Sequence, residues 1–176
     1  MKKARLATMW LDGCSGCHMS LLDIDEAIIA IAQRAEVVYG PLVDAQVYPP
    51  DVDVAIVEGA VSSQDDLEKI KLVRERTRIL VALGDCAVTS NVPAMRNRLP
   101  VKTILERLYI EGADVQKGIP TDGVPTLLRH AIPIHDVVKV DLHVPGCPPP
   151  ASAILFVLNE LLDGRIPELG SKVRFG

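Results

Sequence analysis

Four cysteines are the residues of this 176-residue chain whose type and spacing are best suited to chemistry. Cys14 and Cys17 form a CxxC pair, whereas Cys86 and Cys147 stand alone much further along the chain. Thiolates are soft ligands that suit zinc or an iron–sulfur cluster. Because structural zinc sites usually combine two local pairs of ligands, one pair joined by two distant single cysteines favours a cluster. The sequence therefore predicts one [4Fe-4S] cluster held by all four thiolates.

Each cysteine also has an ordinary interpretation. A CxxC pair between a strand and a helix is typical of a thioredoxin-like dithiol, and a lone cysteine such as Cys86 is commonly a small buried core residue. Cys147 lies between Gly146 and three prolines, which suits a rigid ligand loop but is also compatible with a simple strand-to-helix turn. A thiol–disulfide module and a zinc-stabilised module are therefore open alternatives to an iron–sulfur protein.

The elements that must position these cysteines alternate between short apolar runs and helical patterns, which predicts an α/β fold. The predicted strands are the runs at 5–11, 36–39, 52–57, 78–83 and 137–144. The predicted helices cover 20–34, 64–76, 102–109 and 151–162. Ser20 and Asp23 are placed as a capping box for the first helix, and Ser63 as the cap of the second. The simplest assembly is a flavodoxin-like, doubly wound parallel sheet of about five strands with helices on both faces.

The cysteines all follow the carboxyl ends of predicted strands. Cys14 and Cys17 follow the first strand, Cys86 the fourth and Cys147 the fifth. Ligands bind at this edge in open α/β sheets, so a shared site is expected there. Between residues 88 and 133, recurrent glycines and prolines predict a long irregular insertion, and loops of this length are commonly functional or face a partner.

The composition bounds the class of protein. The chain is 48% hydrophobic and 24% charged with a net charge of −4, which is typical of a folded soluble protein and does not favour nucleic acid as a partner. The length predicts a single cluster-binding domain over residues 1–176. No run approaches the roughly 18 apolar residues of a membrane span, and the amino terminus does not resemble a signal peptide, so we expect a cytoplasmic location.

Four sequence blocks together resemble the small subunit of [NiFe] hydrogenases in their order and spacing. The blocks are residues 10–17 (WLDGCSGC), 57–60 (VEGA), 84–87 (GDCA) and 145–149 (PGCPP). The resemblance implies that the four cysteines bind the [4Fe-4S] cluster proximal to a nickel–iron centre, which itself belongs to a separate large subunit. No catalytic residue is then expected in this chain. The carboxyl-terminal domain that carries further cluster ligands in longer family members is missing, so one cluster is expected.

Residues 84–97 resemble the soluble, bidirectional, NAD-reducing subgroup of these hydrogenases. In that subgroup electrons pass from the proximal cluster to a diaphorase module that carries iron–sulfur clusters, FMN and the NAD site. The alternatives are a small subunit serving F420, viologen-type carriers or a quinone-linked complex, and a complex I-like cluster subunit. The last has adjacent cysteines at its first position, whereas Ser15 and Gly16 separate them here. FMN in this chain is not favoured, because residues 12–17 (DGCSGC) are not rich in Ser and Thr as a flavodoxin phosphate loop is.

Three further residues are assigned hypotheses. Glu58 is predicted to lie beside the cluster, as a proton-linked neighbour or a conditional iron ligand, unless it only caps a loop or pairs with a base. His18 is a candidate donor to a cluster sulfur that would tune the potential, unless it faces solvent. Gly16, together with Ser15 and Ala87, is a candidate source of backbone N–H donors to the cluster.

Overall fold

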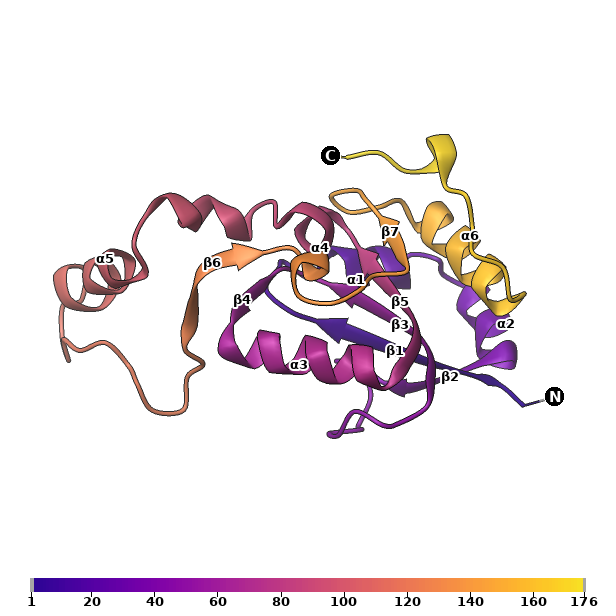
Figure 1. Ribbon diagram of the computed structural model, residues 1–176, viewed down its shortest axis with the longest axis horizontal. Coiled ribbons are helices and arrows are strands. Elements are labelled where there is room, and N and C mark those ends of the chain that lie inside the picture. The colour runs from indigo at the N-terminus through magenta and orange to yellow at the C-terminus, as the bar shows by residue number, and fades with distance from the viewer. Residues whose placement is uncertain (1, 176) are drawn as a thin grey trace.

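A computed structural model describes residues 2–175 and shows a five-stranded parallel sheet flanked by helices (Figure 1). Its strands are β1 (Ala4–Trp10), β2 (Ala35–Tyr39), β3 (Val52–Glu58), β5 (Thr77–Leu83) and β7 (Leu142–Val144). Every neighbouring pair is parallel, and the order across the sheet is β2-β1-β3-β5-β7. This is the flavodoxin-like order, so the predicted α/β fold is confirmed.

Helices cover both faces of this sheet. They are α1 (Gly16–Leu22), α2 (Ala27–Arg34), α3 (Gln64–Glu75), α4 (Asp85–Thr89) and α6 (Ala151–Leu162). On one face, Ala55 and Val57 of β3 pack with Ile70 of α3 in one apolar cluster. On the other face, Val54 and Ile56 pack with residues of α2 and α6 in a second cluster. Because both faces are buried, β3 reads as a nearly continuous apolar run instead of an alternating one.

Two of the predicted helix features are confirmed and two are wrong. Ser63 caps α3 in a capping box, because its hydroxyl accepts from Asp66 N while the Asp66 carboxylate accepts from Ser63 N. The predicted helix at 151–162 is α6. The predicted helix at 20–34 is instead two helices, separated near Asp25, whose φ of 55° is left-handed. Since α1 starts at Gly16, Ser20 is no cap, and its hydroxyl donates to Pro149 O at 2.6 Å.

The last predicted strand is only partly correct. Residues 137–141 lie outside any strand and follow the short helix η3 (Ile134–Asp136), so that β7 covers Leu142–Val144 alone. The reason is local to Asp141, whose carboxylate accepts the backbone N–H of Leu80 at 2.8 Å. The Asp141 side chain thus accepts the hydrogen bond that a backbone carbonyl would accept in a regular pairing of β5 with β7. The regular pairing begins one residue later, at Leu142.

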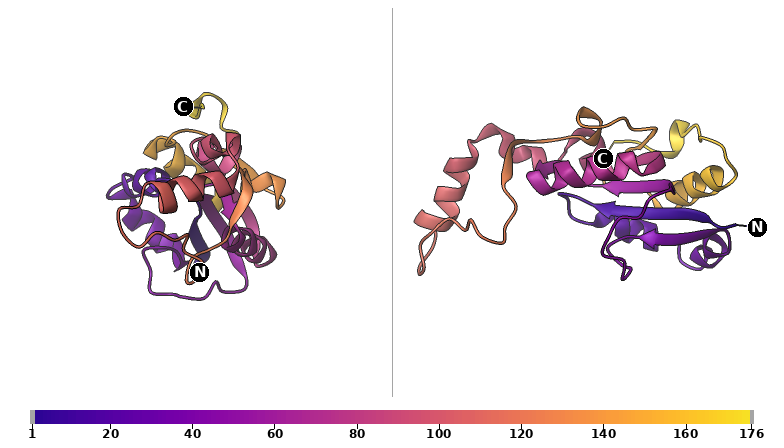
Figure 2. Two further views of the ribbon diagram at one scale, coloured as in Figure 1. Left: turned by 90° about the vertical axis from the view of Figure 1, so that its left-hand side faces the viewer. Right: turned by 60° about the horizontal axis from the view of Figure 1, so that its bottom comes forward.

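The insertion between β5 and β7 forms an arm that projects from the sheet (Figures 1 and 2). After α4 it contains η1 (Pro93–Arg98), α5 (Val101–Glu106) and the π-helical turn η2 (Arg107–Glu111). It returns through β6 (Leu127–Ile132), which pairs antiparallel with β4 (Val61–Ser63). The irregular insertion was predicted, but this second sheet was not. The chain ends after η4 (Gly170–Lys172), and within residues 2–175 no helix is long and apolar enough to cross a membrane.

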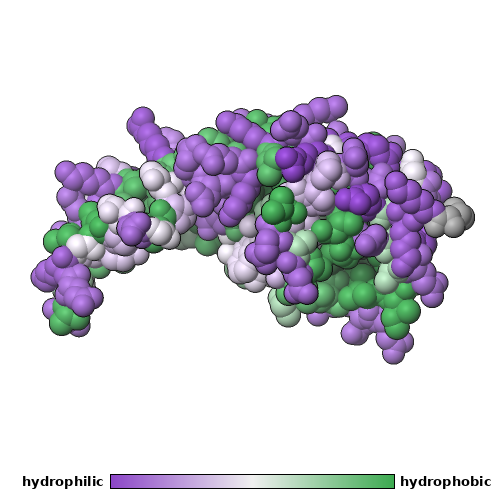
Figure 3. Space-filling view, turned by 90° about the horizontal axis from the view of Figure 1, so that it is seen from below, coloured by the Kyte–Doolittle hydropathy of each residue, from purple (hydrophilic) through white to green (hydrophobic). Residues whose placement is uncertain are grey.

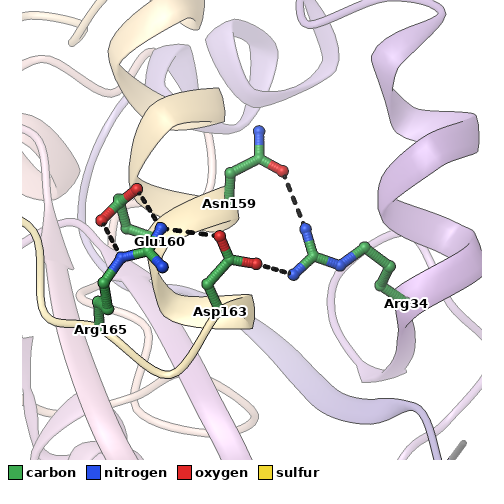
Figure 4. A network of polar contacts seen from close by, with 5 residues as sticks. All are labelled: Arg34, Asn159, Glu160, Asp163 and Arg165. Atoms are coloured by element: carbon green, nitrogen blue, oxygen red, sulfur yellow. Dashed lines mark hydrogen bonds and ion pairs between the residues drawn. The ribbon is translucent and has the colours of Figure 1, made fainter.

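A polar network connects the ends of α2 and α6 (Figure 4). Arg34 donates to Asp163 and, at 3.3 Å, to Asn159, while Arg165 donates to both carboxylate oxygens of Glu160. The hydrogen bonds from Arg34 and Arg165 hold the pKa of Asp163 below its usual value. Because the side chains of Arg34, Asp163 and Arg165 are 38% to 58% exposed, we attribute the packing of these helices to the apolar cluster beneath the network.

Candidate metal centre

The structure brings the four cysteine side chains together from three strand–helix junctions. Cys14 and Cys17 lie in the loop after β1 and the first turn of α1, Cys86 lies in α4 after β5, and Cys147 lies between β7 and α6. All four line one cavity of about 70 Å³, which we call the cysteine cavity. It opens to the surface, because Cys14 and Cys147 are exposed, whereas Cys17 and Cys86 are half-buried.

The spacing of the thiols suits a group larger than one ion. Within residues 2–175 no three Cys, His, Asp or Glu side chains are grouped closely enough to hold a single metal ion. A zinc ion needs sulfurs at about 2.3 Å from one centre. Here the sulfurs surround an open cavity instead, and this donor set of four thiols with room between them fits an iron–sulfur cluster.

Glycines keep the backbone close to the sulfurs. A Cβ on Gly84 would lie 2.2 Å from Cys17 Sγ, and one on Gly16 would lie 3.3 Å from Cys14 Sγ. Gly84 also has a φ of 83°, which non-glycine residues rarely adopt. A side chain at either position would crowd the cysteine cavity, so these glycines help to keep it open.

Asp85 holds two of the cysteine loops together. Its carboxylate accepts the backbone N–H of Gly146 at 2.6 Å, and its own N–H donates to Gly146 O at 2.9 Å. Gly84 N in turn donates to Val144 O at 2.8 Å. The loops before Cys86 and Cys147 are therefore cross-linked by hydrogen bonds, which orients both side chains. The hydroxyl of Ser20 in α1 also donates a hydrogen bond to Pro149 O, which connects α1 to the loop after Cys147. The sequence pattern around Ser20 did not predict this contact.

Glu58 and His18 lie side by side behind Cys17. Glu58 is 2% exposed and lines the cysteine cavity, and its Oε2 accepts the backbone N–H of His18 at 2.8 Å. Glu58 Oε1 has no hydrogen-bond partner within residues 2–175. His18 is 6% exposed, so the interpretation of a solvent-facing histidine is wrong. Its Nδ1 lies 3.2 Å from Glu58 Oε2, although without the alignment of a hydrogen bond.

Both half-buried thiols are held in their neutral form. Burial raises the pKa of the Cys17 thiol strongly, and the charge of Glu58 raises it further. Burial also raises the pKa of Cys86, an effect that a backbone hydrogen bond from Val92 partly offsets. A reactive dithiol needs a lowered pKa, so this environment disfavours the thioredoxin-like alternative. A cationic metal group would reverse the effect by stabilising the thiolates.

The remaining candidates are placed as follows. The Ala87 N–H donates to Gly84 O at 3.1 Å at the start of α4, and its role as a donor to the cluster stays a prediction. Gly16 lines the cysteine cavity, and its role as a donor stays a prediction. Metal binding by the four cysteines likewise stays a prediction, although their side chains share one cavity.

Fold and site together define a class: a flavodoxin-like α/β protein with four cysteines around one cavity at the carboxyl edge of its sheet. Residues 14–161 match the family described as NADH ubiquinone oxidoreductase, 20 Kd subunit. The NAD-reducing hydrogenase HoxS subunit delta of Cupriavidus necator is 36% identical over 97% of this chain and 84% of its own length. The chain belongs to this family, and within it to the small subunits of [NiFe] hydrogenases.

Other similar proteins vary in length. A subunit of the F420-non-reducing hydrogenase of Methanocaldococcus jannaschii is 34% identical, and the chain spans 59% of it. A relative from Archaeoglobus profundus, 27% identical, is described as the iron–sulfur subunit of such a hydrogenase. The crystal structure of an NAD+-reducing [NiFe]-hydrogenase contains a chain with a TM-score of 0.94 and 38% identity, which covers 99% of this chain and is itself fully covered. A [NiFeSe] hydrogenase of Desulfovibrio vulgaris, with 16% identity and a TM-score of 0.59, shares the fold.

Proposed function

We propose that this chain is the electron-transferring small subunit of a cytoplasmic [NiFe] hydrogenase and binds one [4Fe-4S] cluster through Cys14, Cys17, Cys86 and Cys147. The observation that carries the proposal is the single cavity that these four side chains line, in a chain of this family. The nickel–iron centre would lie in the large subunit, so no residue of this chain is proposed to be catalytic.

In this proposal the four cysteines would bind the cluster, and the residues around the cysteine cavity would orient the cysteine side chains. When bound, an iron–sulfur cluster supplies one-electron transfer. The four cysteines would hold it as thiolates, and Asp85 would keep the loops of Cys86 and Cys147 in register through its hydrogen bonds to Gly146. Glu58 and His18, packed behind Cys17, would set the charge and polarity next to the ligands.

For the electron acceptor we propose NAD+, reached through a diaphorase module with iron–sulfur clusters, FMN and an NAD site. In this reaction H2 and NAD+ give NADH and a proton, reversibly. The support is similarity in sequence and fold: the relative described as NAD-reducing is 36% identical, and the chain of the NAD+-reducing enzyme is 38% identical with a TM-score of 0.94. FMN is proposed for the diaphorase and not for this chain.

A second candidate is the small subunit of a hydrogenase that uses another acceptor. It is favoured by the F420-non-reducing relatives, which are 34% and 33% identical to this chain. Their subunits are longer, with only 59% and 57% of their length covered. Assaying the purified complex under H2 with NAD+ and, separately, with benzyl viologen distinguishes the two. Reduction of viologen without any reduction of NAD+ would favour the second candidate.

The cluster itself is tested on the anaerobically purified complex. We expect a brown sample in which iron and acid-labile sulfide exceed the content of a Cys86→Ala variant by four atoms of each per complex. Met95→Leu, a change at a 74% exposed side chain, is the control and should keep both contents unchanged. A complex in which Cys86→Ala leaves iron and sulfide unchanged, or in which zinc replaces them, would contradict the proposal.

A further inference from the structure

A second cavity, of about 250 Å³, lies between α1, α2 and the edge of the sheet formed by β1 and β2. All side chains that line it are apolar apart from those of Thr8 and His18. Leu22, Val37 and Leu42 line it and are 39%, 48% and 68% exposed, so its mouth is apolar and open. Figure 3 shows hydrophobic side chains gathered over β2 and α2 on this face. We call it the apolar cavity.

Two buried polar groups are set in its wall. Thr8 is 7% exposed and His18 is 6% exposed. Within residues 2–175 neither ring nitrogen of His18 makes a hydrogen bond, although Nδ1 lies 3.2 Å from Glu58 Oε2, so Nε2 is the nitrogen without any polar partner. A Cβ on Gly40, which also lines the cavity, would lie 2.4 Å from Thr8 Oγ1, so the missing side chain leaves that hydroxyl uncovered.

A buried polar group without a partner is unfavourable, and a native protein normally satisfies it. A concave apolar site with a few polar groups on its wall is the usual arrangement of a small-molecule site. Both arguments point to the same conclusion: a ligand would supply the hydrogen-bond partner that His18 Nε2 does not find within the protein, and the uncovered hydroxyl of Thr8 could bind the same ligand.

We infer that the apolar cavity binds an aromatic molecule of one or two rings that carries a hydrogen-bonding group such as a hydroxyl. An apolar cavity of about 150 Å³ is enough for benzene, so this larger cavity has room for a second ring. Thr8 and His18 can each donate or accept a hydrogen bond and would orient the polar end. The ligand would then touch the residue that follows Cys17. The inference does not depend on the proposed function, because binding needs no cluster.

The test measures binding of 1-naphthol and of naphthalene to the purified complex by ligand fluorescence. We expect saturable binding of both. Thr8→Val should weaken binding of 1-naphthol about five-fold, the effect of one lost hydrogen bond, and leave naphthalene binding unchanged. Ala35→Phe, at a 4% exposed residue that lines the cavity, should abolish binding of both probes. The controls are Thr103→Val and Ala30→Phe, at exposed residues outside the cavity.

Three results would overturn the inference. The first is the absence of saturable binding to the unmodified complex. The second is an equal loss of affinity for both probes in the Thr8→Val variant. Because this change is nearly isosteric, the variant still tests the inference if Ala35→Phe does not fold. The third is release of the partner subunits by Ala35→Phe but not by Ala30→Phe, because the surface of a partner, and not a small molecule, would then fill the cavity.

Discussion

Gly84 is the glycine at which an added Cβ would come nearest to a cysteine sulfur. Its position after β5 combines a left-handed φ of 83° with a missing side chain that would otherwise lie 2.2 Å from Cys17 Sγ. Glu58, at the end of the neighbouring strand, places a buried carboxylate on the same cavity wall. At this scale the chemistry depends on two properties, the space around the thiols and the charge beside them.

Substitution of Gly84 tests the requirement for space. We expect Gly84→Ala to lower the free energy of unfolding by more than about 1 kcal/mol, because of the left-handed backbone, and to reduce bound iron, because of the contact with Cys17. Thermal denaturation and iron analysis measure the two effects. Gly118→Ala is the matched control, since nothing lies within 4 Å of a Cβ at that position. Equal effects of the two substitutions would contradict the expectation.

Substitution of Glu58 tests the role of charge. Glu58→Gln keeps an oxygen that can accept from His18 N but removes a negative charge beside the thiolates. Reduction adds negative charge, so we expect the cluster's midpoint potential to rise on the order of 50 mV, or about 1 kcal/mol. Redox titration followed by EPR measures this shift. Glu68→Gln, on exposed helix surface, is the control.

The same variant tests the conditional ligand. If Glu58 binds iron after over-oxidation, Glu58→Gln should slow or prevent recovery of the cluster's EPR signal after exposure to air. Unchanged recovery together with an unchanged potential would leave Glu58 as a residue that only caps the first turn of α1.

At the scale of elements, Asp141 joins α3 to the sheet. Arg74 of α3 donates to its carboxylate at 2.6 Å, and Leu80 N of β5 donates to the same oxygen at 2.8 Å. Burial alone would raise the pKa of Asp141, but these hydrogen bonds and the charge of Arg74 outweigh it and hold the pKa below its usual value. The carboxylate form is therefore the one that the folded state stabilises.

This arrangement predicts how stability depends on pH. Because the pKa of Asp141 is lower in the folded state, its contribution is fully present above the ordinary carboxyl pKa of about 3.9 and is lost as the pH falls through the lowered value. Asp141→Asn should cost about 1 kcal/mol of unfolding free energy at pH 7, and the difference should shrink towards pH 3. Denaturant titrations at both pH values measure it. Asp122→Asn, on the exposed arm, should change stability at neither pH.

At the scale of the whole molecule, the arm stands apart from the sheet (Figure 2). None of the residues of α5 and η2 is buried, and apolar side chains such as Leu108 and Val115 are 61% and 78% exposed. A helical segment with exposed apolar side chains and little packing of its own gains stability when a partner covers it. We therefore expect the arm to contact another subunit of the complex.

Point substitutions on the arm test this expectation. Leu108→Ser should reduce co-purification with the large subunit at least several-fold. The thermal stability of the isolated chain should not change, because the Leu108 side chain is exposed when no partner is bound. Lys102→Ser, at an 82% exposed side chain on the same arm, is the control. Assembly that tolerates both substitutions equally would place the interface elsewhere.

Local patterns in the sequence were sufficient to predict much of the fold and to select four candidate ligand residues. The apolar run at 78–83, the helix at 151–162 and the cap at Ser63 were predicted correctly, since each depends on neighbouring residues. The four cysteines could be selected because thiolates are few and chemically distinctive. The family was predicted from four short motifs whose order and spacing resemble those of hydrogenase small subunits, and the family match over residues 14–161 confirmed it.

Tertiary structure decided what depends on residues far apart in the chain. The pairing of β4 with β6 joins two segments that no local pattern of the sequence connects. The hydrogen bond from Leu80 N to the Asp141 carboxylate explains why β7 is shorter than the continuous apolar run at 137–144 predicts. Glu58 and His18 are 40 residues apart, so their contact depends on how α1 packs against the sheet. The meeting of four thiols in one cavity has the same cause: the strand order brings three distant junctions to one edge, and packing alone sets the distances between them.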